Sequence, residues 1–152
     1  MAKADVIYIE QVEGGLTRLA AIFSNEIPPL IGPVRSARIS DIEILAQYGR
    51  VGFAYSGAQR KLLPVIADAN LEDLGAQHES SKIFTTDPNR IPPYAMVLRA
   101  DLLMQKIVDE KLQVDSAKSV GFVFGDNPEG GIPTQKVIIN WPAATYSAEW
   151  SE

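Results

Sequence analysis

Cysteine is absent from this chain of 152 residues, and histidine occurs once. Without cysteine the chain has no disulfide bond, no thiolate metal site and no cysteine nucleophile. No apolar run approaches the roughly 18 residues that a membrane-spanning helix needs. The N-terminus, MAKADVIYIE, lacks the basic, apolar and small-residue regions of a signal peptide. These absences exclude kinds of site without identifying a cellular compartment.

An excess of positive charge is also absent. The net charge is −5, and the 14 lysines and arginines are dispersed along the chain. A surface that follows the phosphates of a nucleic acid is therefore not expected. Hydrophobic residues make up 46% and charged residues 22%, which is typical of a soluble globular domain. The length suits one domain with its own core, and no cofactor or metal motif is present.

The N-terminal third predicts a β-hairpin, a loop and a helix. Residues 4–11 and 16–24 are rich in β-branched and apolar residues, and VEGG (12–15) between them is a turn. The loop NEIPPLIGPV (25–34) contains three prolines, which exclude regular structure. A helix is predicted over 39–48, where Ser40 and Glu43 have the spacing of a capping box.

The rest of the chain predicts further alternation of strands and helices. Short strands are expected at 51–56 and 82–86, and helices at 57–68, where Pro64 should kink or split the helix, and at 99–112. Residues 69–98 are otherwise difficult to assign, and further strands are expected at 119–124, 134–141 and 144–150. The predicted fold is α/β, more exactly mixed α+β: a single domain with a mixed β-sheet and helices packed on it. Its β-α-β segment should cross over right-handed.

The stretch IGPVRSARISD (31–41) carries the most informative chemistry. If the chain is already helical there, Arg35 and Arg38 share a face, so both guanidiniums would reach one ligand. The N–H groups of residues 36–39 at the helix N-terminus, the Ser36 hydroxyl and Arg18 on the preceding strand would assist. This pattern predicts an anion site for a phosphate, a carboxylate or an acidic glycan.

A structural role explains the same residues equally well. Arg35 and Arg38 can pair with Glu13, Asp41 or Glu43 and fix the loop to the hairpin. A cation at a helix N-terminus is itself unfavourable by a few tenths of a kcal/mol, so a carboxylate or a ligand should compensate it. Both interpretations remain open from the sequence.

Three sequence blocks resemble a known family. They are ADVIYIEQVEGGLTRLAAIF, IGPVRSARISDIEILAQYG and FAYSGAQ, and they are similar to the YerB-like lipoproteins of Gram-positive bacteria, whose domain has no established function. The similarity is dense over 4–66, looser to 112 and weak in the terminal strands. Family members are typically secreted and lipid-anchored through an N-terminal cysteine. The resemblance therefore implies an extracytoplasmic, membrane-anchored protein, and residues 1–152 as a single YerB-like domain excised from its leader and a C-terminal extension.

The resemblance also singles out residues. Its signature blocks contain Glu13, Gly14, Gly15, Thr17, Arg18, Gly32, Pro33, Arg35, Ser36, Arg38, Ser56 and Gly57. Many members carry an Ala-Pro-His-Asn-Leu-Tyr-like stretch, whereas this chain has Tyr94 and Ala95 where His and Asn would fall. If that His-Asn pair serves chemistry in the family, it is missing here, and binding survives such a loss more easily than catalysis.

Other candidate residues favour structural interpretations. His78, in AQHESSK, shows no partner and is expected to be a solvated loop residue. The stretch GDNPEGG (125–131) has oxygen ligands for Ca²⁺ but not the calcium-loop spacing, so it predicts a hairpin turn. Asp41 and Glu43 are two apart on a helix and point in different directions. Four aromatic residues could line a sugar-binding surface or belong to the core: Tyr55, Tyr94, Trp141 and Trp150.

Three functional hypotheses follow. The first is a non-catalytic binding domain of the cell envelope, in which Arg18, Arg35, Ser36 and Arg38, with Glu13 and Thr17 beside them, bind an anionic small molecule, a wall polymer or a protein partner. The second is an envelope enzyme, a hydrolase or transferase, with the arginines as electrostatic stabilisers and Glu13 or Asp41 as acid or base. The third is a structural or interaction module with an internal arginine cluster.

Overall fold

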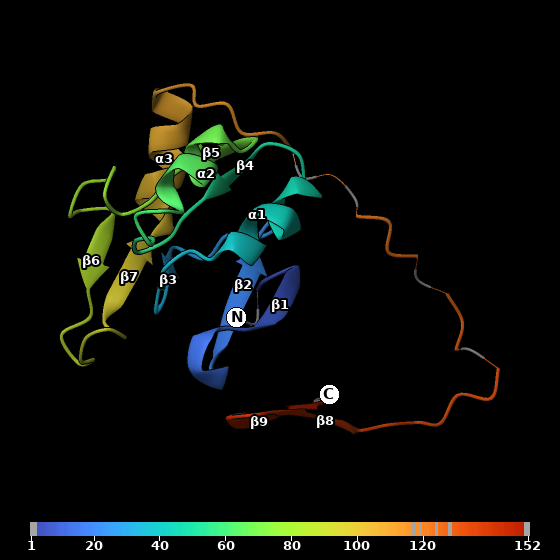
Figure 1. Cartoon of the computed structure of the whole chain (residues 1–152). Coiled ribbons are helices and arrows are strands. Elements are labelled where there is room, and N and C mark those ends of the chain that lie inside the picture. Colours follow the sequence, from blue (N-terminus) through green and yellow to red (C-terminus); the bar gives the residue numbers. More distant parts are fainter. Residues whose placement is uncertain (1–2, 117, 119, 124, 128, 151–152) are drawn as a thin grey trace.

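Mixed α+β architecture is what the computed structural model of the chain shows (Figure 1), as the sequence predicts. The structure describes residues 3–116, 118, 120–123, 125–127 and 129–150. Its helices are α1 (Ile39–Ala46), α2 (Leu63–Asp68) and α3 (Ala100–Asp109), with a 3-10 turn, η1 (Glu13–Gly15). Its strands are β1 (Val6–Gln11), β2 (Thr17–Ile22), β3 (Leu30–Ile31), β4 (Val51–Phe53), β5 (Leu71–Asp73), β6 (Phe84–Thr86), β7 (Met96–Arg99), β8 (Lys136–Trp141) and β9 (Ala144–Glu149).

The strands form several small sheets instead of the one mixed sheet that we expected. β1 pairs with β2 and β8 with β9 in antiparallel hairpins, β3-β7-β6 is antiparallel, and β4-β5 is parallel. Since β2 and β4 belong to different sheets, the predicted right-handed crossover over 16–56 does not occur. The predicted hairpin at the N-terminus is confirmed, with η1 as its turn.

Several predicted boundaries differ for physical reasons. The helix expected over 57–68 begins only at Leu63, so that Pro64 lies in the first turn, where its missing N–H has no intrahelical partner to lose. β3 lies within the proline loop, and β5 and β7 lie in the stretch that the sequence left unassigned. Residues 120–123 of the expected strand 119–124 have no regular structure, and its two ends lie outside the described residues.

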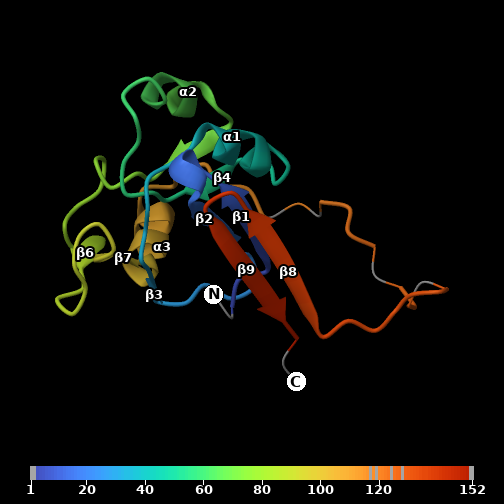
Figure 2. The same cartoon turned by 60° about the horizontal axis from the view of Figure 1, so that its bottom comes forward.

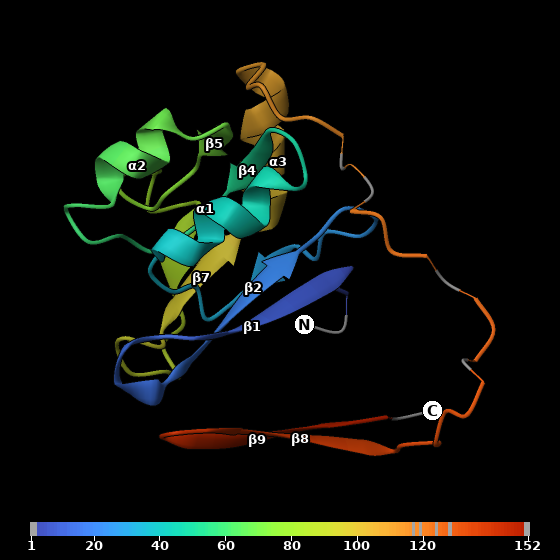
Figure 3. The same ribbon diagram turned by 45° about the vertical axis from the view of Figure 1, so that its right-hand side comes forward.

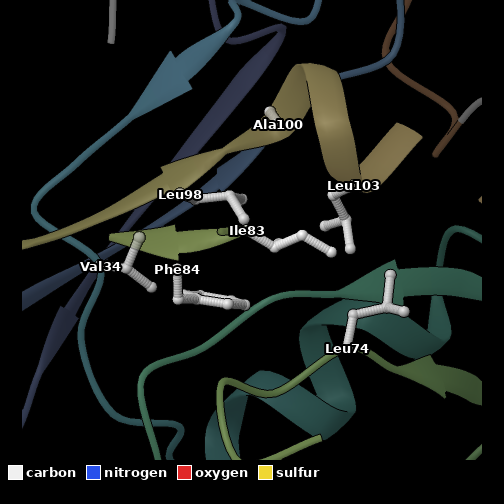
Figure 4. Packing of buried hydrophobic residues seen from close by; sticks show 7 residues of the cluster. All are labelled: Val34, Leu74, Ile83, Phe84, Leu98, Ala100 and Leu103. Carbon is white, nitrogen blue, oxygen red and sulfur yellow. The ribbon is translucent and has the colours of Figure 1, made fainter. Parts of the chain in front are cut away.

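Two buried clusters form the core. One is made of Val34, Leu74, Ile83, Phe84, Leu98, Ala100 and Leu103 (Figure 4), and joins β6, β7 and α3. The other is made of Ala37, Leu45, Tyr55, Leu62, Ile66 and Leu71, and joins α1, α2 and β5. The segment between β3 and α1 contributes one residue to each cluster, which places it where the two meet.

The β8-β9 hairpin lies across the face of the β1-β2 hairpin that points away from α1 (Figures 2 and 3). Gly15 in η1 lies so close to Ala143, in the β8-β9 turn, that a Cβ atom on Gly15 would stand 2.4 Å from the Ala143 Cβ. An open, mostly apolar cavity of about 360 Å³ lies between the hairpins, and Ile9, Leu19 and Tyr146 contribute to its lining. None of the helices in the described part has the length and apolar character to cross a membrane.

Candidate functional site

The segment that carries Arg35 is held at both ends by the core. Val34 is 9% exposed and Ala37 is 2% exposed, each in a different cluster. The Val34 N–H donates to the Met96 carbonyl (2.9 Å), and the Ala37 N–H donates to the Gly57 carbonyl (2.9 Å). Buried anchors and backbone hydrogen bonds together fix the direction in which the Arg35 side chain leaves the chain.

Arg38 is bonded to several neighbouring groups, including a carboxylate. Its Nε donates to Glu13 Oε2 at 2.9 Å, and its Nη1 donates to the Ala37 carbonyl at 2.9 Å. The Arg38 N–H donates to Asp41 Oδ2 at 2.6 Å. These contacts join η1 to the start of α1, so for Arg38 the structural interpretation is sufficient.

Arg35 makes no contact with a carboxylate in the part of the chain that the structure describes. Its Nη1 donates to the Pro93 carbonyl, and its guanidinium carbon lies 4.8 Å from the centroid of the Tyr94 ring, a cation–π arrangement. Its Nε is buried and has no hydrogen-bond partner among the described residues. The charge of Arg35 is therefore held in place by neutral groups.

Arg18, on β2, is less satisfied still. Within the described residues its side chain has no hydrogen bond or ion pair, and its Nε is buried without a partner. Partial burial lowers the pKa of Arg18, and the nearby charges of Arg35 and Arg38 lower it further, while Glu13 and Tyr94 act in the opposite direction. Three guanidiniums thus gather at one place, which we call the arginine cluster: Arg18, Arg35 and Arg38.

The sequence suggested that helical spacing brings Arg35 and Arg38 together, but the structure shows no helix there. α1 begins at Ile39, and Arg38 is its N-cap with extended backbone angles (φ −129°, ψ 162°). The cap uses Asp41, not the Ser40–Glu43 pair that we predicted. The N–H groups of Ala37 and Arg38 both have protein acceptors, so they are not free for an anion. The cluster instead results from tertiary packing.

Thr17 and Ser36, which we also predicted at the anion site, do not present free hydroxyl groups to the arginine cluster in any contact that the structure shows. Thr17 precedes Arg18 on β2, and neighbouring residues of a strand point to opposite faces. Thr17 accordingly lines the cavity between the two hairpins, and its Oγ1 is buried there without a partner among the described residues. Ser36 is half-buried, and its carbonyl accepts a long hydrogen bond (3.4 Å) from Arg38 Nη1.

Asp41 is the buried carboxyl beside the arginine cluster. It is 8% exposed, and burial raises its pKa to about 6, although the hydrogen bond from the Arg38 N–H acts in the opposite direction. Glu10 also raises it, through its charge and a hydrogen bond. Glu10 lies on β1 and also accepts a hydrogen bond from Ser40 Oγ.

His78 has a partner that the sequence did not indicate. Its Nε2 lies 3.3 Å from Asp73 Oδ2, and Asp73 Oδ1 accepts hydrogen bonds from the Tyr55 hydroxyl (2.8 Å) and the Gly75 N–H (3.0 Å). His78 is half-exposed, as expected of a loop residue, but it is tied to the core through Asp73. A shallow cavity of about 410 Å³ adjoins it, bounded on its other side by α2.

The remaining candidates are dispersed. Tyr55 is 1% exposed and belongs to the core, Trp150 is 83% exposed, and the Trp141 ring packs edge-on against Tyr146 with centroids 5.6 Å apart. Of the four aromatics, Tyr94 is the one at the arginine cluster. The described residues contain no group of three histidines, aspartates or glutamates placed to hold a metal ion, and the described part of 125–131 forms no hairpin turn between strands.

Comparison with known proteins gives consistent matches to one family. The family model described as "Protein of unknown function (DUF3048) N-terminal domain" matches residues 1–113. "Putative lipoprotein YerB" of Bacillus subtilis is 47% identical over 38 residues, which is 25% of this chain and 12% of that protein. The crystal structure of YerB from Bacillus subtilis matches with a TM-score of 0.66 at 21% identity over 74% of this chain and 38% of that chain. The chain therefore shares the YerB fold and spans well under half of its relative.

Proposed function

The chain belongs to the DUF3048 family, whose N-terminal domain matches residues 1–113, and we propose a function for it from the arginine cluster, because the function of that family is unknown. The domain binds an anionic group through Arg18 and Arg35, without catalysing a reaction. The observation that carries this proposal is that both side chains are partly buried and that, among the described residues, each has a buried Nε without an acceptor and neither has a carboxylate partner.

Physical chemistry supports a ligand at such a place. A buried guanidinium N–H without an acceptor costs roughly 1–3 kcal/mol, and like charges placed together repel one another. An anion accepts the unused N–H donors and compensates the repulsion, through charge-assisted hydrogen bonds worth about 1.5–3 kcal/mol each. Arg38, already paired with Glu13, contributes its charge and holds the site together.

The alternative functions have less support. An enzyme would use Glu13 or Asp41 as acid or base, but Glu13 is exposed and hydrogen bonds to its own backbone N–H and to Arg38 lower its pKa. Asp41 is buried as the cap of α1, away from solvent. A purely structural role explains Arg38 but leaves the buried Nε–H donors of Arg18 and Arg35 without an acceptor among the described residues.

The name of a relative suggests where the domain acts and which anions it meets. The relative from Bacillus subtilis bears the name "Putative lipoprotein YerB". We propose that this domain is likewise part of a membrane-anchored protein and that it acts outside the cytoplasm. Anions available there include phosphate-bearing wall polymers, acidic glycans and the carboxylates of peptides or protein partners.

Isothermal titration with inorganic phosphate and with citrate tests the proposal. We expect measurable binding to the native domain and a loss of about 10- to 100-fold in affinity in Arg18→Ala and in Arg35→Ala, since each removes a charge-assisted hydrogen bond. Arg60→Ala is the matched control, because Arg60 is exposed and outside the cluster. Equal affinities in Arg35→Ala and Arg60→Ala would reject the arginine cluster as the site.

A further inference from the structure

The loop between β6 and β7 (residues 87–95) reaches the arginine cluster. It lies at the same end of the molecule as η1 (Figure 3), and the Pro93 carbonyl accepts from Arg35 Nη1. The loop is closed by its own hydrogen bonds: the Asp87 N–H donates to the Ala95 carbonyl (2.7 Å), and the Tyr94 N–H donates to the Ile91 carbonyl (2.9 Å). Tyr94 is therefore presented to the cluster by an ordered backbone.

Tyr94 contacts the cluster in two ways. Its ring lies over the Arg35 guanidinium at 4.8 Å, and it is close enough to Arg18 to affect the pKa of that guanidinium. The side chain nevertheless remains 53% exposed. Part of the Tyr94 side chain thus contacts Arg35, and the rest is open to solvent. An exposed aromatic surface of this kind is available to pack against a ligand.

The chain next to Tyr94 extends this open apolar surface. Residues 91–94, Ile-Pro-Pro-Tyr, are all exposed, and Ile91 is 77% exposed. Apolar surface beside a cationic cluster complements a ligand that has both an anionic group and an apolar part. Binding sites commonly combine a few placed polar groups with such an apolar wall.

We infer that Tyr94 is a specificity-determining residue of the anion site, and that the anionic group of the ligand is attached to a ring that packs on Tyr94. The Tyr94 hydroxyl donates to the anion held by Arg18 and Arg35, and the exposed face of the Tyr94 ring packs against the ring of the ligand. This inference rests on the proposed function and adds the chemical class of ligand: a ring-bearing phosphate or carboxylate, in preference to a free inorganic anion.

Titration of the native domain with phenyl phosphate and methyl phosphate tests this inference, because the two esters share their charged group and differ in the ring. We expect phenyl phosphate to bind about three- to tenfold more tightly, the gain typical of an aromatic pair. Tyr94→Leu should abolish the preference. Tyr94→Phe should weaken both esters by a similar factor while keeping their ratio, because it removes only the hydroxyl. Phe122→Leu, at an exposed aromatic residue outside the cluster, should leave both affinities as in the native domain.

The outcomes separate the two proposals. If methyl phosphate binds and requires Arg35 but the ratio between the esters is near one, or is unchanged in Tyr94→Leu, the role of Tyr94 is wrong and the anion site stands. If Tyr94→Phe binds both esters as the native domain does, the hydroxyl has no role. If methyl phosphate fails to bind, or binds equally to Arg35→Ala, the anion site itself is wrong.

Discussion

Arg38 Nε lies 2.9 Å from Glu13 Oε2, and this ion pair joins the turn of the first hairpin to the start of α1. Among the described residues, Glu13 is the carboxylate that contacts a guanidinium of the arginine cluster, so it partly offsets the positive charge that an anion would meet. Since the Glu13 side chain is 61% exposed, solvent screens the pair, and we expect it to contribute little to stability. Its effect on ligand affinity should be larger.

Glu13→Gln should therefore strengthen anion binding. We expect a severalfold higher affinity for phosphate at low ionic strength and a smaller gain at physiological salt, where the Debye length is about 8 Å. The melting temperature should change little. Titration calorimetry at two salt concentrations measures the effect, with Glu129→Gln as a control of equal charge change at an exposed position. A weaker affinity in Glu13→Gln would mean that Glu13 positions Arg38 for the ligand.

The buried carboxyl of Asp41 should make stability depend on pH. Its pKa rises from 3.8 in the unfolded chain to about 6 in the folded protein, so between these values the folded state binds more protons. The free energy of unfolding should then fall as pH rises from about 4 to above 6, by roughly 2–3 kcal/mol from this residue. The stabilising contribution is complete below the unfolded pKa and is lost as pH passes the folded value.

Asp41→Asn should remove this dependence. Asparagine keeps an oxygen to accept the Arg38 N–H and carries no charge to desolvate, so the variant should be more stable than the native domain at pH 7. Urea unfolding at pH 4, 5, 6 and 7 measures the difference. Glu43→Gln removes an exposed carboxyl from the same helix and should follow the native pH profile. An Asp41→Asn profile parallel to the native one would contradict the raised pKa.

The contact between η1 and the β8-β9 turn is testable with two glycines of the same conformation. Gly14 and Gly15 both have φ +72°, but a Cβ on Gly14 meets nothing within 4 Å, whereas one on Gly15 meets Ala143. The two alanine variants share the cost of positive φ, so Gly15→Ala should be less stable than Gly14→Ala by about 1–3 kcal/mol. Ala143→Gly in the same chain should recover part of the difference. Equal stabilities would mean that the hairpins do not pack as described.

The second core cluster depends on α2. Ile66 is 1% exposed, while Val65 beside it is 39% exposed. Ile66→Ala should lower the free energy of unfolding by about 2–5 kcal/mol, and Val65→Ala should lower it much less. Chemical denaturation with both variants decides this, and similar losses in the two would place Ile66 outside the core.

The sequence predicted the first hairpin because its information is local: two β-branched segments flank a paired glycine. β5 and β7 were not predicted because each has only three or four residues and pairs with a strand distant in sequence, β5 with β4 and β7 with β3. Such short strands exist through tertiary contacts and leave no periodic pattern.

The candidate site was predictable in part for the same reason. Arg18 and Arg35 lie in distinctive motifs, but the position of Arg35 depends on the packing of Val34 and Ala37. The helical spacing that we invoked for Arg35 and Arg38 does not occur, because α1 begins only at Ile39. Tyr94 was missed as a cluster residue because it lies 59 positions after Arg35 in sequence and meets it only in the fold. The alternation along a strand could have shown that Thr17 and Arg18 face opposite ways.

The most direct test of the arginine cluster is to map phosphate binding on the native domain by amide chemical shifts in solution. We predict dose-dependent amide shifts at Arg18, at 35–38 and at Tyr94 and Ala95, with the side-chain Nε–H signals of Arg18 and Arg35 moving most. The same titration of Arg35→Ala should show these shifts strongly reduced. Shifts confined to other parts of the chain, or none at millimolar phosphate, would contradict an anion-binding function at this site.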